Sequence, residues 1–193
     1  MYPCAMQRWR SLTLVVLLGC GGDDGGSTPG DGGSGSGSGS GSTGEPAELM
    51  GIVAAHNAVR HMVDTPTPLP DLVWDDGLAA TARAWVAMCR DSEAPTGLID
   101  HNPGRGTNVG ENVFGSSGTA TAQGAVSSWA AEKANYTYAT NSCNGVCGHY
   151  TQIVWRATTK VGCAVATCAG LQFGGTLVCD YSPAGNFSGQ KPY

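Results

Sequence analysis

The most distinctive stretch of this 193-residue chain is Gly148-His149-Tyr150-Thr151-Gln152-Ile153-Val154-Trp155-Arg156. It begins directly after Cys147, so a disulfide at that cysteine would fix the backbone at its start. Two runs rich in valine, threonine and cysteine follow, at Val161–Thr167 and Gly175–Tyr181. Such residues favour strands, and residues 170–174 begin and end with glycines that suit a turn, so the two runs predict a β-hairpin.

Helical patterns dominate the chain before this stretch. Apolar residues at helical spacing predict three helices, which are Ala47–Val63, a second beginning after Asp75 or Asp76, and Ala122–Tyr136. Prolines at 66, 68 and 70 end the first helix, and Asn108–Ser116 favours a short strand. Helices first and strands later predict an α+β fold, with helices packed on a small antiparallel sheet.

Composition and charge exclude several function classes. The chain has 10 Lys and Arg against 15 Asp and Glu, which gives a formal net charge of −5. It contains no basic block of five or more residues, so binding to nucleic acid through phosphate contacts is not expected. Apart from an N-terminal segment, the rest is long enough for one globular domain.

The first 46 residues predict export and a membrane tether. Residues 1–19 contain two arginines and a seven-residue apolar run, Leu12–Leu18, which suits a signal peptide and is too short to span a bilayer. The run ends before Gly19-Cys20, which resembles a bacterial lipobox, so we expect acylation of Cys20; the alternative is an ordinary secretory signal with an incidental cysteine. Residues 21–44 are rich in glycine and serine and predict a flexible tether.

These features predict an extracytoplasmic protein that is lipid-anchored to a bacterial membrane, either the outer membrane or the cell surface. The segments are a signal peptide at 1–19, lipidated Cys20 with its tether at 20–46, and a domain at 47–193. Membrane attachment through acylated Cys20 would leave this domain free to reach a ligand.

Six cysteines remain in the predicted domain: Cys89, Cys143, Cys147, Cys163, Cys168 and Cys179. An even number in an exported domain predicts three disulfides, for which fifteen pairings exist. Local spacing favours Cys143–Cys147, and a Cys163–Cys179 bond would join the two predicted strands. A zinc site built from cysteines is the alternative, but the sequence has no C-x2-C pair.

Several motifs together resemble one known family. The 148–156 stretch closely resembles the first signature of the CAP superfamily, which comprises cysteine-rich secretory proteins, antigen 5 and plant pathogenesis-related proteins of group 1. Residues 179–187 resemble the second signature, and residues 189–193 resemble the tail of the plant members. Three upstream motifs follow in family order, at His56-Asn57 with Arg60, Trp74-Asp75 with Leu78, and Gly110-Glu111-Asn112. The chain departs from the plant pattern at Asp180, where those proteins usually have Asn.

The resemblance implies a fold, a disulfide pattern and a site. The fold is a three-layer α-β-α sandwich with a small central antiparallel sheet, stapled by disulfides. The implied pairs are Cys89–Cys168, Cys143–Cys147 and Cys163–Cys179. The implied site is a cleft lined by two histidines and two glutamates, which in this chain are His101, Glu111, Glu132 and His149.

Two imidazoles beside two carboxylates suit a divalent cation such as Zn²⁺, with His101 and His149 as ligands. The alternative is a hydrogen-bonded polar network that orders the cleft without metal. Elsewhere, His56 on the first predicted helix is expected to be a buried, hydrogen-bonded core residue.

We expect the domain to be a monomeric, non-catalytic binding module. Its ligand would be an apolar or sterol-type lipid, a divalent metal or another protein. The resemblance implies lipid binding in a groove between helices, which Trp129, Tyr136 and Tyr138 could line. The alternative function is a metal-dependent peptidase or esterase that uses Glu111 and Glu132. Against it, the sequence has no H-E-x-x-H and no G-x-S-x-G motif, and paired cysteines leave no free thiol.

Overall fold

The computed structural model describes residues 44–94 and 96–193. The predicted signal peptide, the lipidation site Cys20 and the tether as far as residue 43 lie outside the described residues. Within the described ranges, no helix is long and apolar enough to cross a membrane. Glu45, at the end of the predicted tether, accepts hydrogen bonds from the backbone N–H groups of Gly51 and Val53, at 2.9 and 2.7 Å.

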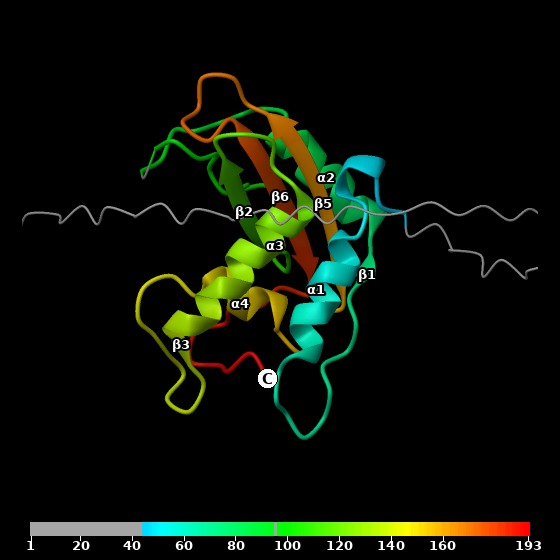
Figure 1. The fold of residues 1–193 in the computed structure, drawn as a ribbon, viewed down its shortest axis with the longest axis vertical. Helices are drawn as coiled ribbons and strands as arrows, with labels where there is room; N and C mark the ends of the chain where they lie inside the picture. Colours follow the sequence, from blue (N-terminus) through cyan, green and yellow to red (C-terminus); the bar gives the residue numbers. More distant parts are fainter. Residues whose placement is uncertain (1–43, 95) are drawn as a thin grey trace, which may run out of the picture. The chain divides into compact units, whose positions relative to one another are not determined.

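A four-stranded sheet forms the centre of the domain, in the order β1-β5-β6-β2 (Figure 1). The strands are β1 (Val73–Trp74), β2 (Gly110–Ser116), β5 (Lys160–Thr167) and β6 (Gly175–Ser182). The predicted hairpin is confirmed, because β5 and β6 pair antiparallel with Cys163 opposite Cys179. The predicted sheet is wholly antiparallel, whereas the two-residue strand β1 pairs parallel with β5.

The helices differ from the predicted ranges at their ends. The structure has the 3₁₀ segments η1 (Ala47–Leu49) and η2 (Glu132–Asn135), the short strands β3 (Tyr136–Thr137) and β4 (Ser142–Cys143), and the helices α1 (Ile52–His61), α2 (Asp76–Val86), α3 (Ala122–Ala131) and α4 (Gly148–Ile153). The first predicted helix is divided because Gly51 has a left-handed backbone, with φ of 85°. The third ends at Ala131, and Tyr136 belongs to β3 instead.

Helices cover both faces of the sheet, which confirms the three-layer α-β-α arrangement (Figure 1). On one face, α2 packs against β5 and β6 through Ala82, Trp85 and Val86. The approach is close at Gly162, where an added Cβ would lie 2.2 Å from the backbone nitrogen of Ala79. The other face carries α1, α3 and α4 around a larger apolar core.

Three disulfides join the pairs that the family resemblance implies. They are Cys89–Cys168, Cys143–Cys147 and Cys163–Cys179, with sequence separations of 79, 4 and 16 residues. Cys89–Cys168 links the end of α2 to the end of β5, and Cys163–Cys179 joins the two central strands. Cys143–Cys147 closes a small loop directly before α4.

Candidate functional site

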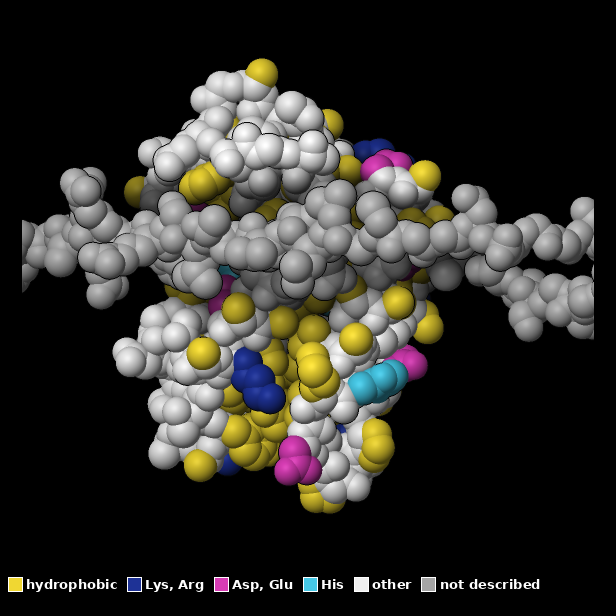
Figure 2. Space-filling model, in the orientation of Figure 1, with side chains coloured by type: hydrophobic (Ala, Val, Ile, Leu, Met, Phe, Trp, Pro, Cys, Tyr) yellow, Lys and Arg dark blue, Asp and Glu magenta, His cyan; other side chains and the backbone are white. Residues whose placement is uncertain are grey.

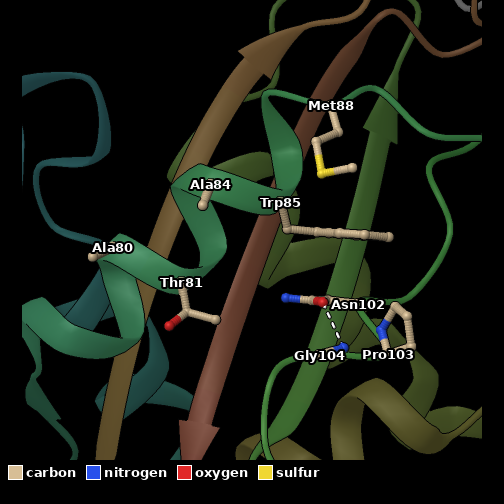
Figure 3. A pocket seen from close by; sticks show the side chains of 8 residues that line it. All are labelled: Ala80, Thr81, Ala84, Trp85, Met88, Asn102, Pro103 and Gly104. Atoms are coloured by element: carbon tan, nitrogen blue, oxygen red, sulfur yellow. Dashed lines mark hydrogen bonds between the residues drawn. The ribbon is translucent and has the colours of Figure 1, made fainter.

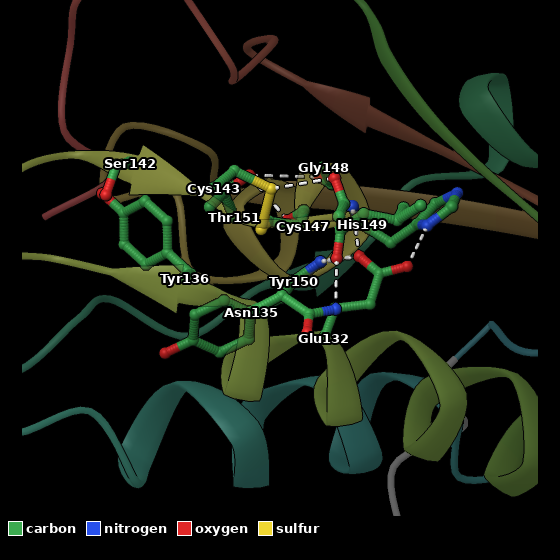
Figure 4. Close-up of a disulfide and its surroundings, with 12 residues drawn as sticks. Glu132, Asn135, Tyr136, Ser142, Cys143, Cys147, Gly148, His149, Tyr150 and Thr151 are labelled. Carbon is green, nitrogen blue, oxygen red and sulfur yellow. Dashed lines mark hydrogen bonds and ion pairs between the residues drawn. A yellow bond between two sulfur atoms is a disulfide. The ribbon is translucent and has the colours of Figure 1, made fainter. Parts of the chain in front are cut away.

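One half of the candidate site is a histidine–glutamate pair at the start of α4 (Figure 4). The Glu132 carboxylate lies 2.6 Å from Nδ1 of His149. Its second oxygen accepts hydrogen bonds from the backbone N–H groups of His149 and Tyr150, at 3.0 and 3.2 Å. Since the Cys147 side chain makes no cap, Glu132 satisfies the first free donors of α4 and orients its imidazole at the same time.

The second half is the pair His101–Glu111, which joins a loop to the edge strand β2. Glu111 Oε1 lies 2.7 Å from Nδ1 of His101 and accepts a hydrogen bond of 2.8 Å from the Asn102 backbone N–H. The loop is folded back on itself, since the Asn102 side-chain oxygen accepts a bond from the Gly104 N–H and Arg105 donates to the Asn102 carbonyl. These bonds hold His101 over Glu111 in a segment without helix or strand.

The two histidines line a common cavity of about 250 Å³, together with apolar Ala94, Leu98, Ile99 and Val113. The structure therefore brings the predicted His101 and His149 together, each with its own glutamate. The imidazoles are 58% and 26% exposed, whereas Glu111 and Glu132 are 0% and 15% exposed. Solvent and ligands consequently meet the rings first, and the carboxylates lie behind them.

The hydrogen bonds also fix which ring nitrogen carries the proton. A carboxylate only accepts hydrogen bonds, so each Nδ1 must carry the hydrogen. In the neutral imidazole, Nε2 then has a free lone pair, and neither Nε2 bonds to another described residue. A carboxylate behind a metal-binding imidazole is the usual outer shell of zinc sites. The described residues contain no group of three or more His, Cys, Asp or Glu placed to hold a metal, so an ion here would have two imidazole ligands and water.

A series of buried hydrogen bonds connects the backbone of His149 to the core. His56 Nδ1 lies 2.7 Å from the Ile52 carbonyl, so that nitrogen carries the hydrogen and Nε2 accepts from the Tyr181 hydroxyl at 2.8 Å. Asn112 donates through Nδ2 to Tyr181 and to the backbone carbonyl of His149, both at 3.1 Å. The prediction of a buried, hydrogen-bonded His56 is confirmed. Sequence reasoning missed that this series of hydrogen bonds reaches the site, because its residues are far apart in the sequence.

Two apolar grooves lie on the helices. The larger, about 650 Å³, is lined by α2 residues and the loop at 102–104 (Figure 3). Trp85 forms its floor, Met88 is 60% exposed at its rim, and the Asn102 side-chain amide points into it. The smaller, about 290 Å³, lies between α1 and α3 and includes Ala58 and Ala130. Figure 2 shows hydrophobic side chains gathered on the face that carries α1 and α3.

The predicted aromatic groove does not form as expected. Trp129 is buried in the core, where it stacks on the His149 ring with centroids 6.0 Å apart. Tyr138 stacks instead on Tyr193, with centroids 4.5 Å apart. Only Tyr136 of the three predicted rings lines a hollow, beside the Cys143–Cys147 disulfide. Aromatic residues at helical spacing commonly pack into the hydrophobic core, as Trp129 does here.

A disulfide-bonded three-layer sandwich with two histidine–glutamate pairs beside one cavity is the arrangement of a CAP-type domain. The sequence profile described as "Cysteine-rich secretory protein family" (CAP) matches residues 53–181. The chain belongs to this family. It is 42% identical to pathogenesis-related protein 1 of Arabidopsis thaliana over 142 residues, which are 73% of this chain and 80% of the relative. It is 36% identical to human GLIPR1-like protein 1, covering 77% of this chain and 64% of that one.

Solved structures show the same fold. Schistosoma mansoni venom allergen-like protein 4 is 28% identical, with a TM-score of 0.59 over 77% of this chain and 95% of that one. A structure titled "Crystal structure of NaASP2 with Zn2+" is 26% identical, with a TM-score of 0.56 over 74% of this chain and 82% of that one. The three disulfides and the family are those of proteins made for oxidising compartments outside the cytoplasm.

Proposed function

We propose that this CAP domain is a non-catalytic binding module whose cavity takes a divalent cation, with Zn²⁺ as the best match. The observation that carries the proposal is the pairing of each histidine with a glutamate through Nδ1, at 2.7 Å for His101 and 2.6 Å for His149. The pairing leaves the Nε2 lone pairs of both rings for a ligand in the cavity that they share. The structure of a relative with Zn²⁺ supports the same choice.

Isothermal titration with ZnCl₂ near pH 7 tests this proposal. Wild type should bind one ion, and the double variant His101→Ala, His149→Ala should lose that binding. His61→Ala is the matched control, because His61 pairs with Asp71 on the surface, with both side chains more than half exposed. Equal zinc binding by wild type and the double variant would overturn the proposal. Since both ligands must be neutral, affinity should also fall on acidification.

An apolar ligand is a second candidate, and the groove on α2 favours it. The groove holds about 650 Å³, and its wall includes Ala80, Ala84 and Met88. The amide oxygen of Asn102 accepts from Gly104, whereas its amide nitrogen bonds to no described residue and faces the groove (Figure 3). A ligand with an apolar body and one hydrogen-bond acceptor, such as a sterol or a fatty acid, fits this lining.

Two blocking variants distinguish the grooves. Ala84→Trp would fill the groove on α2, and Ala58→Trp would fill the groove between α1 and α3. In a binding assay with radiolabelled cholesterol and palmitate, loss in Ala84→Trp alone supports the α2 groove. Loss in Ala58→Trp alone places the lipid between α1 and α3. Absence of binding in wild type removes this candidate.

Metal-dependent hydrolysis of a peptide or ester is the alternative function. It would use Glu111 and Glu132 as general bases, yet both carboxylates already accept backbone and imidazole hydrogen bonds. A panel of peptide and ester substrates tests it: turnover that is lost in Glu111→Gln and Glu132→Gln would favour hydrolysis over simple binding.

We also propose that the protein has a membrane anchor and is a monomer. Acylated Cys20 would hold the domain on a bacterial membrane, with the glycine- and serine-rich tether giving it reach toward a small ligand or another protein. We expect a monomer. Intact mass spectrometry of protein purified from its own membranes reports acylation at Cys20, and light scattering reports the oligomeric state.

A further inference from the structure

A second acid, Asp180, lies beside the Glu111 carboxylate on the neighbouring strand β6. The antiparallel pairing of β2 with β6 sets Asp180 directly opposite Glu111. Asp180 is 0% exposed, and so is the Glu111 side chain. Two carboxyl groups are thus buried side by side at the edge of the sheet, beneath His101.

The hydrogen bonds of this pair are unequal. Glu111 Oε1 accepts from His101 and from the Asn102 N–H. Glu111 Oε2 and both Asp180 oxygens are buried and have no donor among the described residues. The nearby cation, Arg105, directs its Nε and Nη1 to backbone carbonyls at Val109 and Asn102. Among the described residues, no side chain donates a hydrogen bond to Asp180, although the charge of Arg105 acts to lower its pKa.

One proton between the two acids satisfies these buried oxygens. Two ionised carboxylates facing each other away from water repel strongly, so one of them keeps its proton. Glu111 Oε1 already accepts from two donors, whereas neither Asp180 oxygen has a donor among the described residues, so the proton belongs on Asp180. Burial, followed by the charge of Glu111, raises the pKa of Asp180 to about 8.

We infer that Asp180 is a positioning residue: its neutral carboxyl donates a hydrogen bond to Glu111 Oε2 and holds that carboxylate against His101. Asp180 does not line the cavity that the two histidines share, and it acts through Glu111. The inference rests on the proposed function only where it predicts an effect on zinc binding.

Two substitutions of Asp180 by residues of similar size test whether its side chain acts as a hydrogen-bond donor or only fills space. Asp180→Asn keeps a side-chain donor, through Nδ2, and should bind zinc within about twofold of wild type. Asp180→Leu keeps most of the volume and removes the donor, and it should weaken zinc binding by about 10- to 100-fold, the range for lost outer-shell partners of metal sites. Affinity retained in Asp180→Leu would overturn the inference.

A spectroscopic measurement on wild type tests the proton itself and does not depend on metal. The infrared spectrum at pH 6 should contain the carbonyl band of a buried protonated carboxyl that is missing in Asp180→Asn. In ¹⁵N-edited NMR spectra, the His101 Nδ1–H signal should persist in Asp180→Asn and exchange rapidly with water in Asp180→Leu. Absence of the carboxyl band from wild type would overturn the inference even if Asp180→Leu did not fold. If wild type shows the band but binds no zinc, the proposed metal function fails and the role of Asp180 stands.

Discussion

His56 links the stability of the core to pH. The structure holds this imidazole neutral between the Ile52 carbonyl and the Tyr181 hydroxyl. Burial, assisted by the charge of Arg60, lowers the pKa of His56 from 6.5 to about 4. Between these two values the unfolded chain binds more protons than the folded one at this residue. The contribution of His56 to the free energy of unfolding is therefore complete above pH 6.5 and is lost as the pH falls toward 4.

The size of this contribution follows from the shift in pKa. Lowering the pKa of His56 to about 4 corresponds to a loss of about 3 kcal/mol on acidification. Asp180 has a raised pKa and contributes the opposite slope, so wild type alone does not isolate His56. Urea unfolding of wild type and His56→Gln between pH 4 and 7 does isolate it: the stability advantage of wild type should shrink by that amount at pH 4. An advantage that does not change with pH contradicts the account.

At the scale of elements, α4 is the least predictable part of the fold and the most important for the site. It has six residues, too few to show a helical period in the sequence. Tertiary contacts define both of its ends. Glu132 accepts from the first N–H groups, and buried Arg60 donates to the carbonyls of Ile153 and Trp155 at 2.7 and 2.9 Å.

Removal of the Arg60 guanidinium should strongly destabilise this element. Besides the carbonyls of Ile153 and Trp155 at the C-terminal end of α4, Arg60 donates to those of Pro70 and Thr158; burial lowers its pKa to about 10, so it stays charged at neutral pH. Arg60→Met leaves four carbonyls without that donor, so we expect the free energy of unfolding to fall by more than about 3 kcal/mol. Exposed Arg83, in the last turn of α2, is the control, and Arg83→Met should change stability by less than about 0.5 kcal/mol. Similar losses in both variants would contradict this role.

At the scale of the whole molecule, we expect the disulfides to have different roles: one mainly stabilises the fold, and another mainly holds the site in place. Cys89–Cys168 closes a long loop with a separation of 79 residues, whereas Cys143–Cys147 spans 4. Loop-closure entropy predicts losses of about 4 and about 2 kcal/mol when each pair is replaced by serine. We expect the second replacement to weaken zinc binding as well, because Cys147 directly precedes the helix that carries His149. Thermal unfolding and zinc titration of both double variants test this, and an equal effect on zinc affinity would contradict it.

The sequence predicted the global arrangement better than its details. The strands at 161–167 and 175–181, the layered fold and the disulfide pairs were confirmed, because strong β patterning and family motifs specify them. The break at Gly51 and the end of the third helix were missed, since they depend on local backbone geometry and tertiary contacts. The opposition of Glu111 and Asp180 needed the strand register, which the sequence does not supply.

A crystal soaked in ZnCl₂ and measured at the zinc absorption edge would show whether His101 and His149 hold one cation between them. We predict one strong anomalous peak in the cavity, bonded at about 2.0–2.1 Å to Nε2 of both His101 and His149, with both Nδ1 atoms still on their glutamates. A peak on only one histidine, a peak elsewhere on the protein, or no peak at saturating zinc would contradict it.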